Sequence, residues 1–308
     1  MEKMLTVLTI VLPVLSALAL GWFSRRRKLL NESAVEGLKT LVMRFMLPAV
    51  LLQAFYQVEF SANLLLIAAC MFLCCMAGLG LGAILSRIYK GDGKLLPFLT
   101  CGFEAGMMGY GLYAMLFPPI QTYNFAMVDL GQVLFVFTVY SALLNRQKNI
   151  SGRQTLRLMV TSPVFLAIAV GIVLSASGLG RLLQESGAGG PFDSALRYIG
   201  APTGMLMIFV VGYQLVWSRP SLKAALLTVA LRTVIMGVLC VSVLLALRIL
   251  LPMEPPLFWA VVLMFTLPAP FVLPIFSGDE AQKGYVATTL SVGTLLSIGL
   301  FAVISMLQ

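Results

Sequence analysis

Residues 13–21 read PVLSALALG, and residues 163–171 read PVFLAIAVG. The two segments align without a gap, and the proline, the valine, both alanines and the glycine coincide. Each segment lies within a stretch free of Lys, Arg, Asp and Glu, and a second pair of prolines, Pro48 and Pro202, follows at a similar spacing. We interpret the two segments as the first helices of an internal repeat that fills each half of the chain.

The composition excludes a soluble protein. Of 308 residues, 60% are hydrophobic and 11% are charged, whereas soluble domains carry about 25% charged residues. A bilayer core needs about 20 helical residues to cross it. Six stretches of that length carry no Lys, Arg, Asp or Glu: 4–24, 60–86, 158–180, 198–218, 255–278 and 284–308. Four more have one ionisable residue in their interior, so that ten transmembrane helices are predicted: 38–57 (Arg44), 95–117 (Glu104), 123–144 (Asp129) and 223–250 (Arg232).

Basic residues are distributed unevenly over the connecting loops. If the loops alternate between the two membrane faces, one face collects fifteen Lys and Arg residues and the other collects four, Lys3, Arg181, Arg197 and Arg248. Because Lys and Arg gather on cytoplasmic loops, the richer side is expected to be the cytoplasmic one. This places both termini outside and the basic segment 145–158 in the cytoplasm. It also explains the net charge of +9 without nucleic acid as a partner.

The repeat and the span count together predict an inverted topology. Each half contains five predicted spans, and because five is an odd number the second half enters the membrane from the opposite face. Inverted repeats of this kind are typical of secondary transporters. The predicted division is a first five-helix repeat over 1–144, a cytoplasmic linker over 145–158 and a second, inverted five-helix repeat over 159–308.

The fourth and ninth spans contain residues that interrupt helices. The segment CGFEAGMMGYG (101–111) has four glycines, and LPAPFVLP (267–274) has three prolines. Proline removes a backbone donor and clustered glycine weakens a helix, although both residues are also common where membrane helices pack closely. Since the two clusters occupy equivalent places in two repeats, we expect broken, crossing helices 4 and 9. The binding site would include Gly106, Gly109, Pro268 and Pro270.

Two charges are expected near that crossing. Glu104 and Arg232 each lie nine residues from a cytoplasmic helix start, about 14 Å deep at 1.5 Å per residue. A charge at that depth is costly and marks a functional site by default. Arg232 is expected to hold a substrate carboxylate with its planar guanidinium, and Glu104 to bind substrate or a coupling proton. A structural salt bridge between the two is the alternative.

Five further polar residues lie in predicted spans. Asp129 and Gln132 share one side of the fifth span and, with Glu104, are candidates for coupling a proton or a sodium ion; a wet vestibule or a helix–helix hydrogen bond explains them equally well. Three hydroxyls on the tenth span are candidate substrate ligands, although such groups more often bond the carbonyl four residues earlier: Thr288, Ser291 and Thr294. The sequence has no His, and its five Cys lack metal-binding spacing, so neither a metal site nor a cofactor is expected.

The order and spacing of several motifs resemble the auxin efflux carrier family of bacterial permeases and plant hormone exporters. The run LPVLSALALGWF (12–23), the basic residues after it and LPA (47–49) are similar to the first two helices of that family. LPA (267–269), GD (278–279) and ATTLSVGTLLS (287–297) are similar to its last two. The resemblance covers nearly the whole chain. It implies ten helices in two inverted repeats, two crossing broken helices and an organic anion, such as malate or malonate, as substrate. Glu104 stands where the family usually has Asn.

Together these features predict a secondary transporter rather than an enzyme. It would move a small mono- or dicarboxylate across the bacterial inner membrane by alternating access around the crossing. The sequence has no Gly-x-x-x-x-Gly-Lys-Ser/Thr loop for ATP. Two alternatives are left open: a sodium- or proton-coupled antiporter or symporter with Glu104 and Asp129 as ion ligands, and a membrane sensor that transports nothing. Expected partners are the anion and the lipid bilayer, with a homodimer as the candidate assembly.

Overall fold

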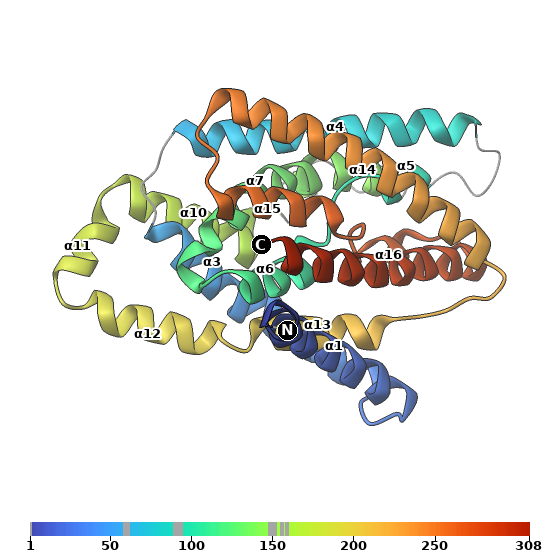
Figure 1. Ribbon diagram of the computed structural model, residues 1–308, viewed down its shortest axis with the longest axis horizontal. Coiled ribbons are helices and arrows are strands. Elements are labelled where there is room, and N and C mark those ends of the chain that lie inside the picture. Colours follow the sequence, from blue (N-terminus) through green and yellow to red (C-terminus); the bar gives the residue numbers. More distant parts are fainter. Residues whose placement is uncertain (1, 58–61, 89–94, 147–152, 155–156, 158–159) are drawn as a thin grey trace.

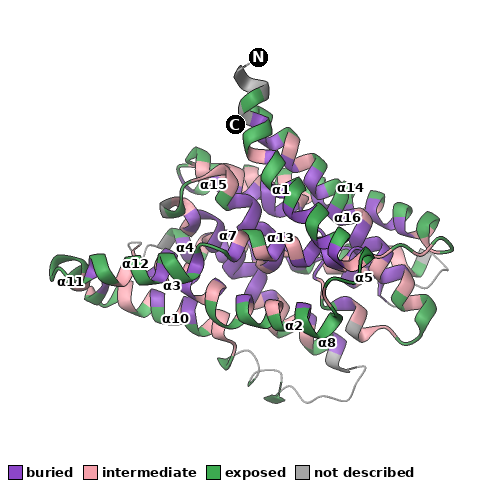
Figure 2. Cartoon of the chain, turned by 90° about the horizontal axis from the view of Figure 1, so that it is seen from below, coloured by how far each residue is buried: buried purple, intermediate pink, exposed green. Residues whose placement is uncertain are grey.

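The computed structural model describes residues 2–57, 62–88, 95–146, 153–154, 157 and 160–308. These residues form helices and their connections, and no β-strand occurs among them. Figure 1 shows α4 and α14 along one edge of the molecule and α12 and α13 along the opposite edge, with α7, α15 and α16 between them. The two chain termini lie close together in both orthogonal views (Figures 1 and 2).

The first half contains four long helical runs and one interrupted run. The first is α1 (Glu2–Arg26), and the second joins α2 (Glu32–Leu41), the π-helical η1 (Val42–Met46) and α3 (Leu47–Tyr56). The third is α4 (Ala62–Ile88). The interrupted run follows and consists of α5 (Leu96–Leu99), η2 (Ala105–Gly109) and α6 (Tyr110–Leu116). After the short η3 (Pro119–Gln121) comes the fourth long run, in which a π-helical turn joins two α-helices: α7 (Thr122–Phe135), η4 (Val136–Tyr140) and α8 (Ser141–Arg146).

The second half has a similar order of elements. It begins with α10 and α11, which are bent by 76° against each other, and it again contains an interrupted run, between α15 and α16. Its elements are α10 (Pro163–Ala176), α11 (Leu179–Glu185), α12 (Gly189–Gly200), α13 (Thr203–Gln214), α14 (Leu222–Leu250), α15 (Pro255–Thr266), η5 (Leu273–Phe276) and α16 (Glu280–Leu307).

Seven helices in the described ranges are long and apolar enough to cross a membrane, and the bent α10–α11 pair makes eight if it is one span. The two other predicted spans, 95–117 and 255–278, are the interrupted runs. They do not form continuous helices, because α5 is followed by five non-helical residues and α15 ends at the Pro-rich segment. Ten membrane crossings therefore stay a prediction. The helix interruptions lie within the Gly-rich segment 101–111 and the Pro-rich segment 267–274, as predicted.

One predicted boundary is wrong. The seventh span was expected over 198–218, but the helical run starts at Gly189 and ends at Gln214. The first half of this run, α12, carries Asp193 and Arg197, and a search for charge-free stretches misses such a helix. The predicted linker 145–158 lies mostly outside the described residues.

Glycines allow the first helix of each half to pack closely against the other half. A Cβ at Gly21 would lie 2.0 Å from the Phe209 carbonyl oxygen, so that α1 crosses α13 in close contact. Gly171, which aligns with Gly21, lies against α3, where its Cβ would be 2.6 Å from the Cβ of Phe55. The first helix of each half thus packs on the second helical run of the other half.

The outer surface is apolar where it would meet lipid. Buried residues gather in the centre of the molecule, and exposed residues lie toward its periphery, along α1 among others (Figure 2). Many of the exposed side chains are large and hydrophobic, among them Leu65, Leu73, Ile84, Val234, Val238, Leu245 and Ile249. A surface of this kind is unfavourable in water, since soluble proteins rarely expose large contiguous apolar patches, and it fits a hydrocarbon environment.

Candidate functional site

The two interrupted runs touch at the centre of the protein. The backbone N–H of Glu104 donates a hydrogen bond to the carbonyl oxygen of Pro268 at 2.9 Å. Gly102 has a φ of +65°, a conformation that glycine adopts readily, and its Cβ would lie 3.2 Å from Cγ of Pro270. The crossing, as we call this contact of residues 100–104 with 267–271, joins segments from both halves of the chain.

Arg232, on α14, satisfies backbone carbonyls of both interruptions. Its Nη1 donates to the oxygens of Leu99 (3.0 Å) and Cys101 (3.4 Å), and its Nη2 donates to those of Gly102 (2.6 Å) and Leu267 (3.0 Å). These carbonyls lie where α5 and α15 end, so they have no helical N–H partner. Arg232 is 6% exposed, and no carboxylate pairs with it in the described part of the chain. The guanidinium of Arg232 therefore links the two helix interruptions through its hydrogen bonds.

The carboxylate of Glu104 is bound by backbone N–H groups from both runs. Oε1 accepts from the N–H of Met107 at 3.2 Å and Oε2 accepts from the N–H of Phe271 at 2.6 Å. Met107 lies in η2, which continues into α6, so the carboxylate caps the start of a half-helix where negative charge is favoured. Glu104 does not pair with Arg232 within the described residues. The predicted alternative of a buried salt bridge between them is not the arrangement in this structure.

Asp129 and Gln132, on α7, lie beside the crossing and have different roles. Gln132 donates through Nε2 to the carbonyl oxygen of Phe103 at 2.6 Å, which satisfies one more acceptor of the first interruption. Asp129 is 3% exposed; its Oδ2 accepts from the hydroxyl of Tyr110 at 3.0 Å, whereas its Oδ1 is buried without a hydrogen-bond partner. A buried acceptor without a partner is costly, and Asp129 is therefore the stronger candidate of the two for holding a proton or an ion.

The three hydroxyls of α16 that were predicted to bind substrate are buried and lie in different surroundings. Thr288 accepts from the backbone N–H of Ser218, and Ser291 accepts from that of Val216, both at 2.9 Å. Ser291 also bonds the carbonyl four residues earlier, as expected for such a hydroxyl. Thr294 has no hydrogen-bond partner for its buried hydroxyl. Two of the three predicted ligands thus hold the connection between α13 and α14.

The two predicted glycines of the fourth run differ in their surroundings. At Gly109 a Cβ would lie 2.4 Å from Cζ of Phe125 and 2.8 Å from Cδ1 of Leu267, so this glycine permits close packing beside the crossing. At Gly106 the nearest atom would be Cε of Met43 at 3.6 Å, which leaves room for a side chain. Within the described ranges no cluster of Cys, Asp or Glu is arranged to hold a metal ion.

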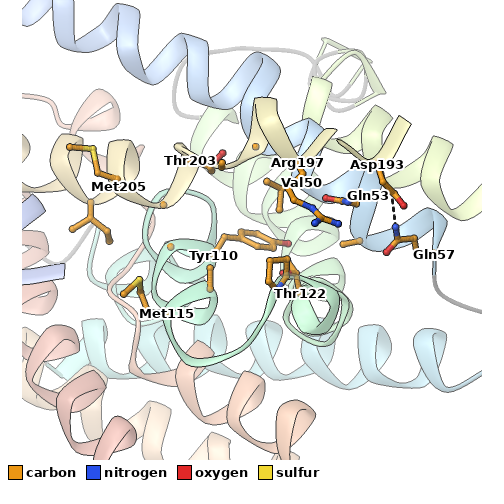
Figure 3. A pocket seen from close by; sticks show the side chains of 18 of the residues that line it. Val50, Gln53, Gln57, Tyr110, Met115, Thr122, Asp193, Arg197, Thr203 and Met205 are labelled. Atoms are coloured by element: carbon orange, nitrogen blue, oxygen red, sulfur yellow. Dashed lines mark hydrogen bonds between the residues drawn. The ribbon is translucent and has the colours of Figure 1, made fainter. Parts of the chain in front are cut away.

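A cavity of about 890 Å³ lies beside the crossing, between α1, α3, α6 and the α12–α13 run. Figure 3 shows its polar side chains, which come from α3, α6, α7, α12 and α13. Tyr110 joins the cavity to the crossing, because its ring lines the cavity while its hydroxyl bonds Asp129. The cavity therefore leads from the connections around 117–122 and 186–190 toward the candidate coupling carboxylate.

Sequence reasoning missed the charged groups of this cavity. Asp193 and Arg197 lie one turn apart on α12 and both line the cavity; Asp193 accepts hydrogen bonds from Gln57, Gln53 and the hydroxyl of Tyr56. The available signal was the pair of charges four residues apart in a helix whose other face is apolar and exposed. Because charged residues more often lie at the ends of membrane spans, the pair did not indicate a helix that continues through it.

An all-helical protein with an apolar surface, whose interior polar groups meet at two helix interruptions, has the construction of a membrane transporter. Residues 6–305 match the family described as membrane transport protein. Because the match covers nearly the whole chain, the protein belongs to this family. The matched region is the domain of the auxin efflux carrier family. It is a family of transporters, not of enzymes. No curated protein sequence matches the chain.

Proposed function

We propose that the protein is a secondary transporter for a small organic anion, a mono- or dicarboxylate, which it binds at the crossing. The observation that carries this proposal is the carboxylate of Glu104, bound by N–H groups of Met107 and Phe271 from the two interruptions. The crossing thus provides the donors that a carboxylate needs. A substrate carboxylate would bind there when Glu104 moves away or carries a proton.

Alternating access between two repeats is supported by the way the two halves pack: the first helix of each half lies against the second helical run of the other half. Gly21 brings α1 against α13, and the aligned Gly171 brings α10 against α3. Two inverted repeats would produce this pairing, since each first helix would meet the equivalent helix of the other copy. In such transporters one bundle rocks against the other around a fixed central site. Arg232, which bonds carbonyls of both interruptions, would keep that site intact during the motion.

A proton is the coupling ion that the geometry favours. The unpartnered Oδ1 of Asp129 would be satisfied by a proton that it shares with a neighbour, and Asp129 is linked through Tyr110 to the cavity. Gln132 is already bonded to Phe103, so it contributes less to an ion site than Asp129. A sodium-coupled transporter is the competing proposal.

We place the protein in a bacterial inner membrane, and the charge bias of the loops supports an orientation with both termini outside. The cavity borders the end of α6, whose Leu116 carbonyl accepts from Nε2 of Gln308, so the cavity and the C-terminus lie on one side of the protein. On this orientation the cavity would open to the outside.

Uptake by proteoliposomes tests the proposal and the nature of coupling together. Labelled malate, malonate and acetate would be offered with an imposed pH gradient, with a sodium gradient or with none. We expect saturable uptake of at least one carboxylate, accelerated by the pH gradient and reduced in Asp129→Asn. Acceleration by sodium alone would favour the sodium-coupled alternative. Binding without any uptake would favour the sensor.

A further inference from the structure

We infer that the cavity between α1, α3, α6 and α12 is a substrate subsite for a small carboxylate that also carries a hydrogen-bond donor, an amine or a hydroxyl group. Arg197 binds the carboxylate of this ligand, and Asp193 binds its donor group. The inference deepens the proposed function and rests on it, because that function names only an organic anion. Figure 3 shows the two side chains on neighbouring turns of α12.

Arg197 is an unpaired cation on the exposed side of a largely apolar cavity. It lines the cavity and points into it (Figure 3), and it has no ion-pair or hydrogen-bond partner in the described part of the chain. A guanidinium stays charged in such surroundings and can bind a carboxylate through two parallel hydrogen bonds. Arg197 is itself exposed, as are its neighbours Tyr198 and Ile199, so its guanidinium lies on the open side of the cavity, where a ligand would enter. Arg197 is thus the residue of this helical turn that offers a charge to a ligand.

Asp193 is held in place by neutral donors and keeps one oxygen available. Its Oδ1 accepts from Nε2 of Gln57 at 2.7 Å, from Nε2 of Gln53 at 3.3 Å and from the hydroxyl of Tyr56. These three bonds fix the carboxylate on α3, although its spacing of four residues from Arg197 would allow the two to pair. Oδ2 has no hydrogen-bond partner among the described residues. A ligand amine or hydroxyl would find a preorganised acceptor there.

The size, the remaining polar group and the charge of the cavity agree with such a ligand. The cavity of about 890 Å³ is ample for a small metabolite. Thr203 also lines it, is 4% exposed and has a hydroxyl without a partner. The charges of Asp193 and Arg197 cancel, so a ligand with one cationic and one anionic group is matched, whereas a plain dianion would meet the Asp193 carboxylate. Glu104 at the adjoining crossing disfavours a plain dianion in the same way.

Three ligands that differ at one carbon atom test this assignment. Succinate, malate and aspartate share two carboxylates and carry a hydrogen, a hydroxyl and an amine at that carbon. Their binding would be measured by titration calorimetry on the full-length protein in detergent. We expect malate or aspartate to bind about tenfold more tightly than succinate or better, which is ~1.4 kcal/mol. Asp193→Asn should bring the ratio close to one, and Arg197→Gln should weaken all three about tenfold, with Arg197→Lys between.

A matched control removes a charge outside the cavity. Arg181, which pairs at the surface with Glu185, should tolerate Arg181→Gln without a change in any of the three affinities. The assignment is overturned if the wild-type protein binds none of the ligands, if Asp193→Asn keeps the wild-type ratio, or if Arg197→Gln and Arg197→Lys both bind like wild type. Because binding is measured without flux, a protein that shows this order of affinities but no uptake would retain the subsite and refute the transport function instead.

Discussion

Arg232 was expected to hold the substrate anion, and in this structure its guanidinium makes four hydrogen bonds to the backbone. Each of its hydrogen bonds goes to a backbone carbonyl that a helix interruption leaves free. Each buried polar group left unpaired costs about 1–3 kcal/mol. Arg232→Gln should therefore lower the midpoint of thermal unfolding in detergent strongly, and Arg232→Lys less, because the ammonium has three donors.

The double variant distinguishes this role from a salt bridge. If Arg232 neutralised Glu104, Arg232→Gln combined with Glu104→Gln would recover stability. Since the two side chains bind different backbone groups, we expect the double variant to be no more stable than Arg232→Gln alone. Recovery of the wild-type unfolding midpoint would contradict the contacts described here.

Glu104 is the residue through which protonation would regulate the crossing. Its negative charge is matched to two N–H groups, and protonation removes that charge and frees the donors for a substrate carboxylate. Glu104→Gln should leave the protein folded and flatten the pH dependence of initial uptake rates without abolishing it, because Asp129 still carries the coupling proton. Glu280→Gln, a surface change beside Lys283, is the control. A wild-type pH profile in Glu104→Gln would show that Glu104 is structural or a substrate ligand.

The sequence could predict that Glu104 and Arg232 lie near the crossing, whereas it could not predict which groups their side chains bond. The depth of Glu104 and Arg232 follows from counting along a helix, and both lie at the crossing as expected. The carbonyls that Arg232 bonds are 35 to 133 residues away in the chain, and only the packing of α14 against both interruptions brings them together. Asp193 and Arg197 were missed for the opposite reason, because their charges were taken as the edge of a span.

At the scale of elements, the interruptions were the most predictable feature. Clustered glycine in 101–111 and proline in 267–274 weaken helices whatever surrounds them, and both segments are non-helical in part. The bend between α10 and α11 and the early start of α12 were not predictable in this way. The bend falls at Gly178, which has a φ of +74°. The early part of α12 includes a charged side chain that another helix satisfies, as Asp193 is satisfied by α3.

The close packing of α1 against α13 predicts that alanine is unfavourable at Gly21 and tolerated at a control glycine, Gly80. Gly21→Ala would place a Cβ against the Phe209 carbonyl and force the helices apart, a cost of about 1–3 kcal/mol by analogy with overpacked cores. Gly80→Ala in α4 meets nothing within 4 Å and should be neutral or slightly stabilising. Thermal unfolding of the two variants checks the difference. Equal midpoints would contradict the tight contact of α1 with α13.

For the whole molecule, the topology follows from the loop charges and can be tested by fusions. A reporter enzyme that is active only in the cytoplasm should be inactive when fused after Gln308 and active when inserted within 147–152. The hydrogen bond from Gln308 to Leu116 places the C-terminus beside the end of α6, so a reporter at residue 117 should be inactive as well. The reverse activity at any of these positions would contradict the arrangement of ten crossings.

The central claim, that a small organic anion crosses the membrane by alternating access through the crossing, is tested most directly by counterflow. Proteoliposomes would be loaded with an excess of an unlabelled carboxylate and diluted into a trace of the same labelled compound, with no ion gradient. We predict transient accumulation of label above its equilibrium level for the wild-type protein, because a carrier exchanges substrate across the membrane. Simple equilibration, or no entry of malate, malonate, succinate or aspartate with a folded protein, would contradict the account.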